Sequence, residues 1–116
     1  MKAVKTIVGV VAIVAAAALV YFVVGAHRTA DLNNRAMGLL EQSRFAEARD
    51  LLEQASRRNP NNPVIWRNLG TAYEGLREPA KAVQAYERSL ALRPDQTELR
   101  AELAALKKLL ELEAKK

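Results

Sequence analysis

The pattern of apolar and polar positions divides the chain into two unlike parts. Residues 7–26 read IVGVVAIVAAAALVYFVVGA, without a charge, an amide or a proline. From residue 29 onward, apolar residues recur at helical spacing among polar ones, and no stretch alternates with the period of a strand. The first pattern predicts a helix that is apolar on all sides, and the second predicts helices with one buried face. We therefore expect an all-α fold.

The apolar segment has the length of a membrane span. A helix of this length extends roughly 30 Å, which is about the hydrocarbon thickness of a bilayer. Lys2 and Lys5 precede it, and His27 and Arg28 follow it. The rest of the chain is too small to enclose such a helix. We predict a basic tail at 1–6 and an uncleaved, membrane-spanning signal anchor at 7–26, which contacts lipid and is separated from the next helical unit by only 27–30.

A cleaved signal peptide is the alternative. Val24, Gly25 and Ala26 would suit a cleavage site, and cleavage would release a soluble exported protein. The apolar core of a signal peptide usually spans about 7–15 residues, so the length of this segment favours an anchor.

The flanking charges predict the topology. Lys2, Lys5 and the α-amino group are concentrated at the N-terminus, whereas Arg28, Arg35 and Arg44 are spread along the chain. This density favours a cytoplasmic N-terminus. We expect a single-pass protein of the bacterial inner membrane, with the remaining residues on the periplasmic side.

Small residues mark one face of the predicted span. Gly9, Ala12 and Ala16 recur at helical spacing, and such a face lets another membrane helix approach closely. These residues are candidates for packing within the membrane. The alternative is that alanine is only a tolerated filler in an anchor.

The rest of the chain contains an internal repeat. Asn59-Pro60 and Arg93-Pro94 lie 34 residues apart. The same offset matches small residues with small ones and large with large: Ala36 with Gly70, Leu39 with Tyr73, Ala48 with Ala82, Leu52 with Tyr86, and Ala55 with Ser89. Small residues let two helices cross closely and large ones fill the space beside the crossing, so each unit is predicted to be a pair of antiparallel helices.

Helix-capping residues support these units. Asn62 can cap a helix that begins at Pro63, and Asp95 with Glu98 has the spacing of a capping box for the last helix. Pro60 and Pro94 end the preceding helices, because proline has no N–H group.

These positions resemble the tetratricopeptide repeat (TPR) family. Residues 63–96 carry its signature at Trp66, Leu69, Gly70, Tyr73, Ala82, Tyr86, Ser89 and Pro94. Residues 29–62 resemble a weaker copy through Leu32, Ala36, Leu39, Ala48, Leu52, Ala55 and Pro60, and depart from it at Arg35, where the family usually has an apolar residue. The resemblance implies two helix-turn-helix repeats, at 29–62 and 63–96, followed by a capping helix at 97–116.

The last segment has one clear apolar face. Leu99, Leu103, Leu106 and Leu110 share it and are expected to cover the end of the second repeat. Leu109 and Leu112 lie beyond this face. They either widen the capping face or provide a surface for self-association or for a partner.

The composition argues against catalysis. The 116 residues include no cysteine and one histidine, His27, and the formal net charge is +5. No Gly-rich phosphate loop and no metal-binding motif occurs. Arg57-Arg58 is a single basic pair and not a basic stripe. We expect no enzyme activity, no catalytic residue, no cofactor, no metal and no nucleic-acid partner.

The family resemblance implies a protein-binding groove lined by the first helix of each repeat. Its candidate residues are Asn33, Met37, Leu40, Arg67, Asn68, Thr71 and Glu74, joined from the last helix by Glu98, Ala101 and Ala105. Some members bind a terminal carboxylate through Lys, Arg and Asn at set positions, of which only Asn33 and Asn68 match in kind here. Glu98 and Glu102 stand in place of cations and would repel that ligand.

The sequence thus predicts a non-enzymatic, membrane-anchored scaffold or adaptor that binds proteins as an accessory or assembly subunit of a membrane complex. A peptide-binding targeting or import-type receptor at a membrane surface is one alternative. A structural subunit whose span fills a gap between other helices is another.

Overall fold

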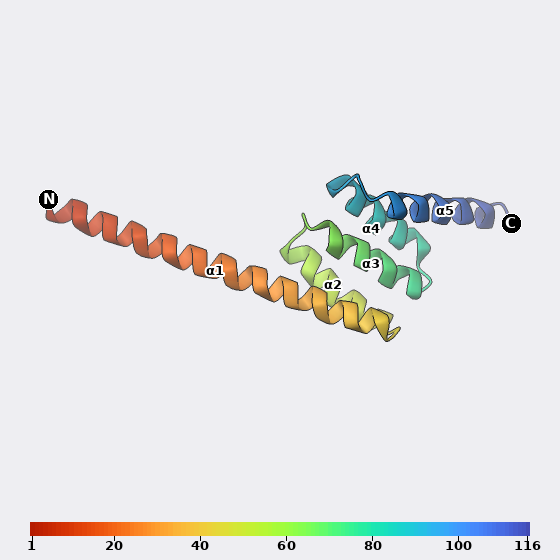
Figure 1. The fold of residues 1–116 in the computed structure, drawn as a ribbon, viewed down its shortest axis with the longest axis horizontal. Helices are drawn as coiled ribbons and strands as arrows, with labels where there is room; N and C mark the ends of the chain where they lie inside the picture. The colour runs from red at the N-terminus through yellow and green to blue at the C-terminus, as the bar shows by residue number, and fades with distance from the viewer.

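Five helices make up the computed structural model, which describes residues 1–116. They are α1 (Lys2–Glu41), α2 (Phe45–Arg58), α3 (Pro63–Gly75), α4 (Pro79–Leu92) and α5 (Thr97–Ala114) (Figure 1). Consecutive helices are antiparallel, because short turns connect them. The all-α prediction is confirmed.

Helix α1 runs without a break from the apolar segment into the bundle. The residues expected to separate the two, 27–30, are themselves helical. They contain no proline or glycine, and the hydroxyl of Thr29 donates a hydrogen bond to the carbonyl of Gly25 within the same helix (3.0 Å). The junction is therefore a stretch of regular helix.

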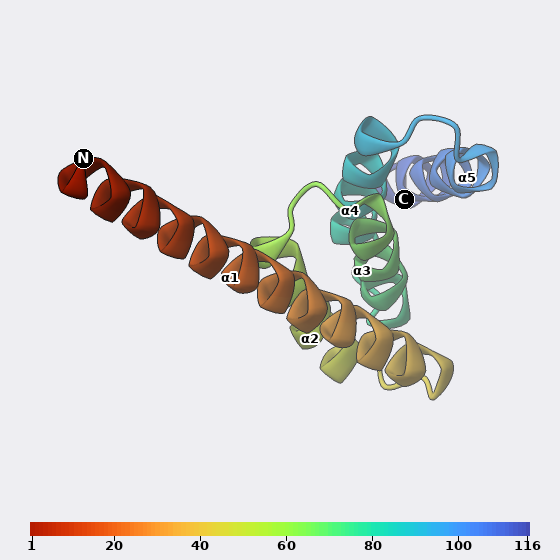
Figure 2. The ribbon, with the colours of Figure 1, turned by 60° about the vertical axis from the view of Figure 1, so that its left-hand side comes forward.

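Only the C-terminal part of α1 packs against other helices. Its buried residues are Thr29, Leu32 and Ala36, and no residue before Thr29 is buried. The molecule measures 78 × 28 × 21 Å because the first part of α1 extends away from the bundle (Figures 1 and 2). By length and composition, α1 is the one helix that could span a membrane.

The turns after α1 and α3 have the same backbone form. Ser43 and Arg77 adopt left-handed backbone angles, with φ of 57° and 58°. In each turn the next amide closes the helix end, Arg44 N–H on the carbonyl of Leu39 (2.8 Å) and Glu78 N–H on that of Tyr73 (2.9 Å). Helices commonly end in this way, usually with glycine at the left-handed residue. The two left-handed residues are themselves 34 positions apart.

The two remaining turns differ in how the following helix begins. Asn62 caps α3 as predicted, because its side chain accepts a hydrogen bond from the Val64 amide (3.0 Å). The predicted capping box at Asp95 and Glu98 is wrong: α5 begins at Thr97 after Gln96, without a side-chain cap. The Gln96 amide instead donates to the carbonyls of Ser89 (3.2 Å) and Arg93 (3.0 Å), which ties the turn to the end of α4.

The core follows the pairing that the offset predicts. Ala36 and Gly70, Ala48 and Ala82, Leu52 and Tyr86, and Ala55 and Ser89 are all buried, and Leu39 and Tyr73 are both half-buried. One cluster joins α1 to α4, and a second joins α4 to α5 through Ala82, Tyr86, Leu99 and Leu103.

Helix α5 covers the end of the bundle through the predicted apolar face. Leu99 and Leu103 are buried, and Leu106 packs beside them. Leu109 and Leu112 remain 58% and 51% exposed. Leu109 and Leu112 therefore do not belong to the face of α5 that covers the bundle.

Substitutions at two glycines, one in a crowded position and one in an open position, test this packing. A methyl group added at Gly70 would overlap the ring of Tyr86, whereas one added at Gly38 meets nothing within 4 Å. We expect Gly70→Ala to lower the free energy of unfolding by about 1–3 kcal/mol through overpacking. Gly38→Ala should raise it by about 0.5–1 kcal/mol, because alanine favours a helix. Denaturant unfolding of both variants checks the pair, and equal effects would contradict the packing described here.

Candidate protein-binding face

The residues predicted to line a groove lie on the first helices of the two helix pairs. Asn33, Met37 and Leu40 are on α1, and Arg67, Asn68, Thr71 and Glu74 are on α3. We call this set the first-helix face. The three further groove candidates, Glu98, Ala101 and Ala105, lie on α5 and are all exposed.

Two asparagines join α1 to α3 on this face. The Asn68 side-chain amide donates to the side-chain oxygen of Asn33 (3.0 Å), and the Asn33 amide in turn lies 3.7 Å from the sulfur of Met37. Met37 itself is 43% exposed. The structure therefore brings two predicted asparagines together beside the accessible, flexible apolar side chain of Met37, which suits contact with a protein surface.

A second polar group lies further along α3. The Tyr86 hydroxyl donates to a carboxylate oxygen of Glu74 (2.5 Å) and lies 3.4 Å from the hydroxyl of Thr71. Thr71 also donates to the carbonyl of Arg67 one turn earlier (3.3 Å). The ring of Tyr86 is buried against Gly70, so the packing of the core fixes the position of its hydroxyl.

Leu40 and Tyr86 differ from expectation. Leu40 is half-buried and packs against the core, because it faces inward beside Leu39. Tyr86 was predicted as a structural signature residue only, yet its hydroxyl reaches Thr71 and Glu74. A tyrosine at the position that Leu52 occupies in the first unit was the available signal, since tyrosine carries a polar tip that needs a partner.

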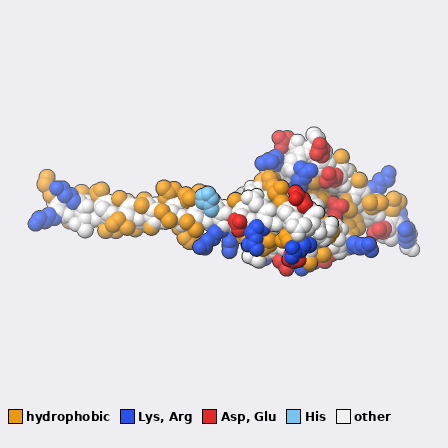
Figure 3. Space-filling model, turned by 60° about the horizontal axis from the view of Figure 1, so that its bottom comes forward, with side chains coloured by type: hydrophobic (Ala, Val, Ile, Leu, Met, Phe, Trp, Pro, Cys, Tyr) orange, Lys and Arg blue, Asp and Glu red, His pale blue; other side chains and the backbone are white.

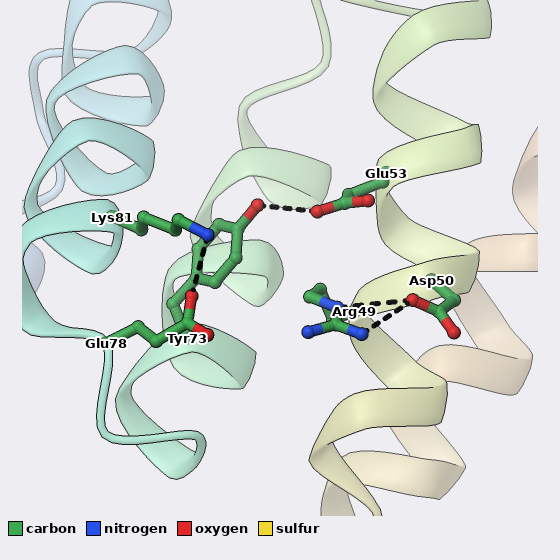
Figure 4. Close-up of polar contacts among 6 residues, drawn as sticks. All are labelled: Arg49, Asp50, Glu53, Tyr73, Glu78 and Lys81. Atoms are coloured by element: carbon green, nitrogen blue, oxygen red, sulfur yellow. Dashed lines mark hydrogen bonds and ion pairs between the residues drawn. The ribbon is translucent and has the colours of Figure 1, made fainter.

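Another polar cluster, missed by sequence reasoning, joins α2, α3 and α4 (Figure 4). The Tyr73 hydroxyl donates to Glu53 of α2 (2.7 Å), and the Lys81 ammonium of α4 lies 5.7 Å from the centre of the Tyr73 ring. Lys81 also pairs with Glu78 (3.0 Å). Nothing in the spacing of these residues along the chain indicates that they meet.

Both tyrosines have raised pKa values. Burial, followed by the hydrogen bond to Glu53, raises the pKa of Tyr73 to about 12. Burial and the hydrogen bond to Glu74 also raise the pKa of Tyr86. In each case the neutral phenol donates to a carboxylate, and an ionised phenolate would lose that bond and repel the same carboxylate.

The small-residue face of the predicted span meets no other part of the chain. Gly9 has nothing within 4 Å of its added methyl position, and Ala12 and Ala16 are exposed. Packing of these three residues against another membrane helix therefore stays a prediction.

The two phenols predict how stability depends on pH. Their folded pKa values lie above the ordinary value of 10, so their stabilising effect is complete below pH 10. The effect of Tyr73 is lost as pH rises from 10 to 12, and that of Tyr86, whose pKa is raised further, starts to fall in the same interval. We expect the melting temperature to fall over this interval. Tyr86→Phe should lower stability by about 1 kcal/mol at neutral pH and flatten the alkaline decline. Tyr21→Phe is the control, because Tyr21 is exposed on α1, and an equal flattening in this control would contradict the assignment.

Residues 33–97 match the family described as tetratricopeptide repeat. Among curated proteins, the peroxisomal targeting signal receptor of Saccharomyces cerevisiae is 36% identical over 70 residues, which is 59% of this chain. Protein FlbA of Caulobacter vibrioides is 36% identical over 63 residues, or 54% of this chain. The chain spans about a tenth of the length of each of these relatives, 11% in both cases.

Solved structures with the same fold include two domains with bound peptides. The first TPR of Spaghetti (RPAP3), bound to the HSP90 peptide SRMEEVD, has a TM-score of 0.70 and 26% identity, over 74% of this chain and 70% of that one. The second TPR domain of human RPAP3, in complex with the HSP70 peptide SGPTIEEVD, has a TM-score of 0.65 and 28% identity, over 69% and 67%. The family match covers more than half of this chain. The chain therefore belongs to the tetratricopeptide repeat family, whose fold is a scaffold for protein–protein interaction.

Proposed function

We propose that the chain is a membrane-anchored TPR adaptor that serves as an accessory or assembly subunit of a membrane protein complex. In this proposal residues 7–26 span the membrane, residues 29–62 and 63–96 form two repeats, and residues 97–116 cap them. The observation that carries it is the shape of α1, whose apolar part is exposed along its whole length and continues directly into the repeats.

Exposed apolar surface on this scale favours a lipid environment. The 18-residue window of highest mean hydropathy in α1 has none of its residues buried by the rest of the chain. In water, a patch of this size would be an aggregation hazard or an interaction site. In a bilayer it is satisfied by lipid along its length and by another helix at Gly9, Ala12 and Ala16. We place the repeats on the periplasmic side of a bacterial inner membrane, following the flanking charges.

The first-helix face is the proposed site for the soluble part of the partner. Met37 supplies exposed apolar surface, and Arg67, Asn68 and Thr71 supply polar groups beside it. The charges on this face and on the neighbouring α5 differ from what the acidic peptides of the two solved structures would require. Glu74, Glu98 and Glu102 are all exposed and would repel a peptide that ends in EEVD.

A peptide-binding receptor is the second candidate, because the proteins similar to this chain include a targeting receptor and two peptide complexes. It predicts that the first-helix face alone carries binding and that the span only holds the domain at the membrane. The adaptor predicts that the span contributes to binding.

Replacing residues 7–26 by polyleucine of the same length separates the two candidates. We expect the adaptor to lose the partners that co-purify with it at fixed stoichiometry, because polyleucine has no small-residue face. Met37→Glu and Arg67→Glu should also weaken binding, and Gln54→Glu, exposed on α2, is the matched charge control.

Full retention of partners by the polyleucine form, with loss in the Met37 and Arg67 variants, would establish a plain peptide-binding module instead. Intact mass decides a further alternative in the same preparation. An anchored chain keeps Met1 or Lys2, whereas a cleaved leader leaves a soluble protein that begins at His27.

A further inference from the structure

The turn between α2 and α3 lies at the end of the bundle from which α1 projects (Figures 1 and 2). Because α2 is antiparallel to α1, its last residue, Arg58, returns to the level of Thr29. The turn between α4 and α5 is close by, since the Ser89 hydroxyl donates to the carbonyl of Pro63 and Gln96 bonds to Ser89. This end of the bundle therefore faces whatever surrounds the start of the projecting helix.

The level of Arg58 coincides with the expected headgroup layer. A bilayer has about 5–7 Å of polar region on each side of its hydrocarbon core, which is roughly four residues of helix. If the apolar residues 7–26 occupy the core, residues 27–30 of α1 lie in the headgroups. Arg58 and Asn59 line the same space as Gly25, Arg28 and Thr29.

The cations at this end of the bundle have no carboxylate partners. Arg57 and Arg58 are exposed at the end of α2, Arg28 is exposed on α1, and none of the three forms a salt bridge. Blue side chains lie beside the pale-blue histidine where the projecting helix meets the bundle (Figure 3).

The opposite end of the bundle carries both paired and unpaired cations. Arg44 bonds to Glu47 (2.6 Å), Arg49 to Asp50 (3.1 Å) and Lys81 to Glu78 (3.0 Å). Arg77, Lys115 and Lys116 form no salt bridge there, so it is the position of Arg28, Arg57 and Arg58 beside the start of the projecting helix that suits a surface that meets anions.

The same place contains an open crevice of about 1130 Å³ between α1 and the end of α2. Its wall along α1 is apolar and includes Val20 and Val24. Its rim on the side of the bundle carries Arg28, Arg58 and Asn59. An apolar wall that ends in two guanidinium groups and an amide matches a phospholipid, with an acyl chain along the helix and a phosphate at the arginines.

We propose that this crevice binds an anionic phospholipid and that the α2–α3 end of the bundle rests on the bilayer surface. The proposal rests on the membrane anchor of the proposed function. Arg28 and Arg58 bind the headgroup phosphate, Arg57 adds attraction to the surrounding anionic surface, and the continuous helix α1 holds all three at headgroup level.

Trp66 provides a built-in reporter for this contact. It is the only tryptophan in the chain, and its indole N–H donates to the carbonyl of Pro60 in the α2–α3 turn (2.8 Å). Its fluorescence therefore follows the position of that turn relative to the bilayer. The experiment uses the full chain in vesicles that contain a fixed amount of phosphatidylcholine with a nitroxide on its headgroup.

We expect stronger quenching of Trp66 when the remaining lipid is a three-to-one mixture of phosphatidylcholine and phosphatidylglycerol than when it is phosphatidylcholine alone. Raised salt should weaken the difference. Arg28→Gln with Arg58→Gln should weaken docking about 25-fold, at roughly fivefold for each charge. Lys115→Gln with Lys116→Gln, which removes the same charge from the far end of α5, should leave the quenching unchanged.

Carbonate extraction of each sample separates failure of this proposal from failure of the anchor. A chain that is extracted has no anchor, which would overturn both. A chain that resists extraction but is quenched equally in both lipid mixtures, or whose two double variants behave alike, keeps its anchor and contradicts the lipid site alone.

Discussion

The rest of the structure depends on one uninterrupted helix, whose first part is apolar and exposed and whose last part packs into the bundle. The first part of α1 has no buried residue, whereas the last part buries a stripe at Thr29, Leu32 and Ala36. Residues 27–30 contain no proline or glycine, so the junction itself lacks the usual residues at which helices kink. The orientation of the apolar segment relative to the bundle is therefore set by regular helix geometry. This constraint places the turn after α2 level with the end of the apolar segment.

Within the bundle, close helix crossings depend on small residues facing large ones. Gly70 lies against the ring of Tyr86, and this contact fixes the tyrosine hydroxyl beside Glu74. Tyrosine thereby links the core to the candidate binding face. A substitution at Gly70 or Tyr86 should consequently also alter the candidate binding face.

The sequence predicted those features that depend on local pattern. The helical class, the offset that pairs Ala36 with Gly70, and the cap at Asn62 all follow from spacing and from residue type. The continuity of α1 was harder to predict, because the change in composition near His27 resembles a boundary although nothing there breaks a helix. The capping box at Asp95 failed because Gln96 bonds backward to α4, a choice made by tertiary contacts.

The cations near the predicted span come from distant parts of the chain. Counting flanking cations along the chain includes Arg28, but Arg57 and Arg58 lie some thirty residues later and reach the same level only through the return of α2. In the same way, Tyr73 meets Glu53 and Lys81 from two other helices. Such groups become neighbours through the fold alone.

We expect the apolar part of α1 and the helical bundle to form one rigid unit. The chain has no cysteine, so cysteines introduced at Ala12 and Gln84, both exposed, can carry two spin labels without background. The distance between the labels, measured by pulsed electron–electron double resonance on the full chain in bilayer discs, should have a single narrow distribution. Two glycines inserted between Arg28 and Thr29 should broaden it. A distribution that is already broad without the inserted glycines would contradict a rigid junction between the two.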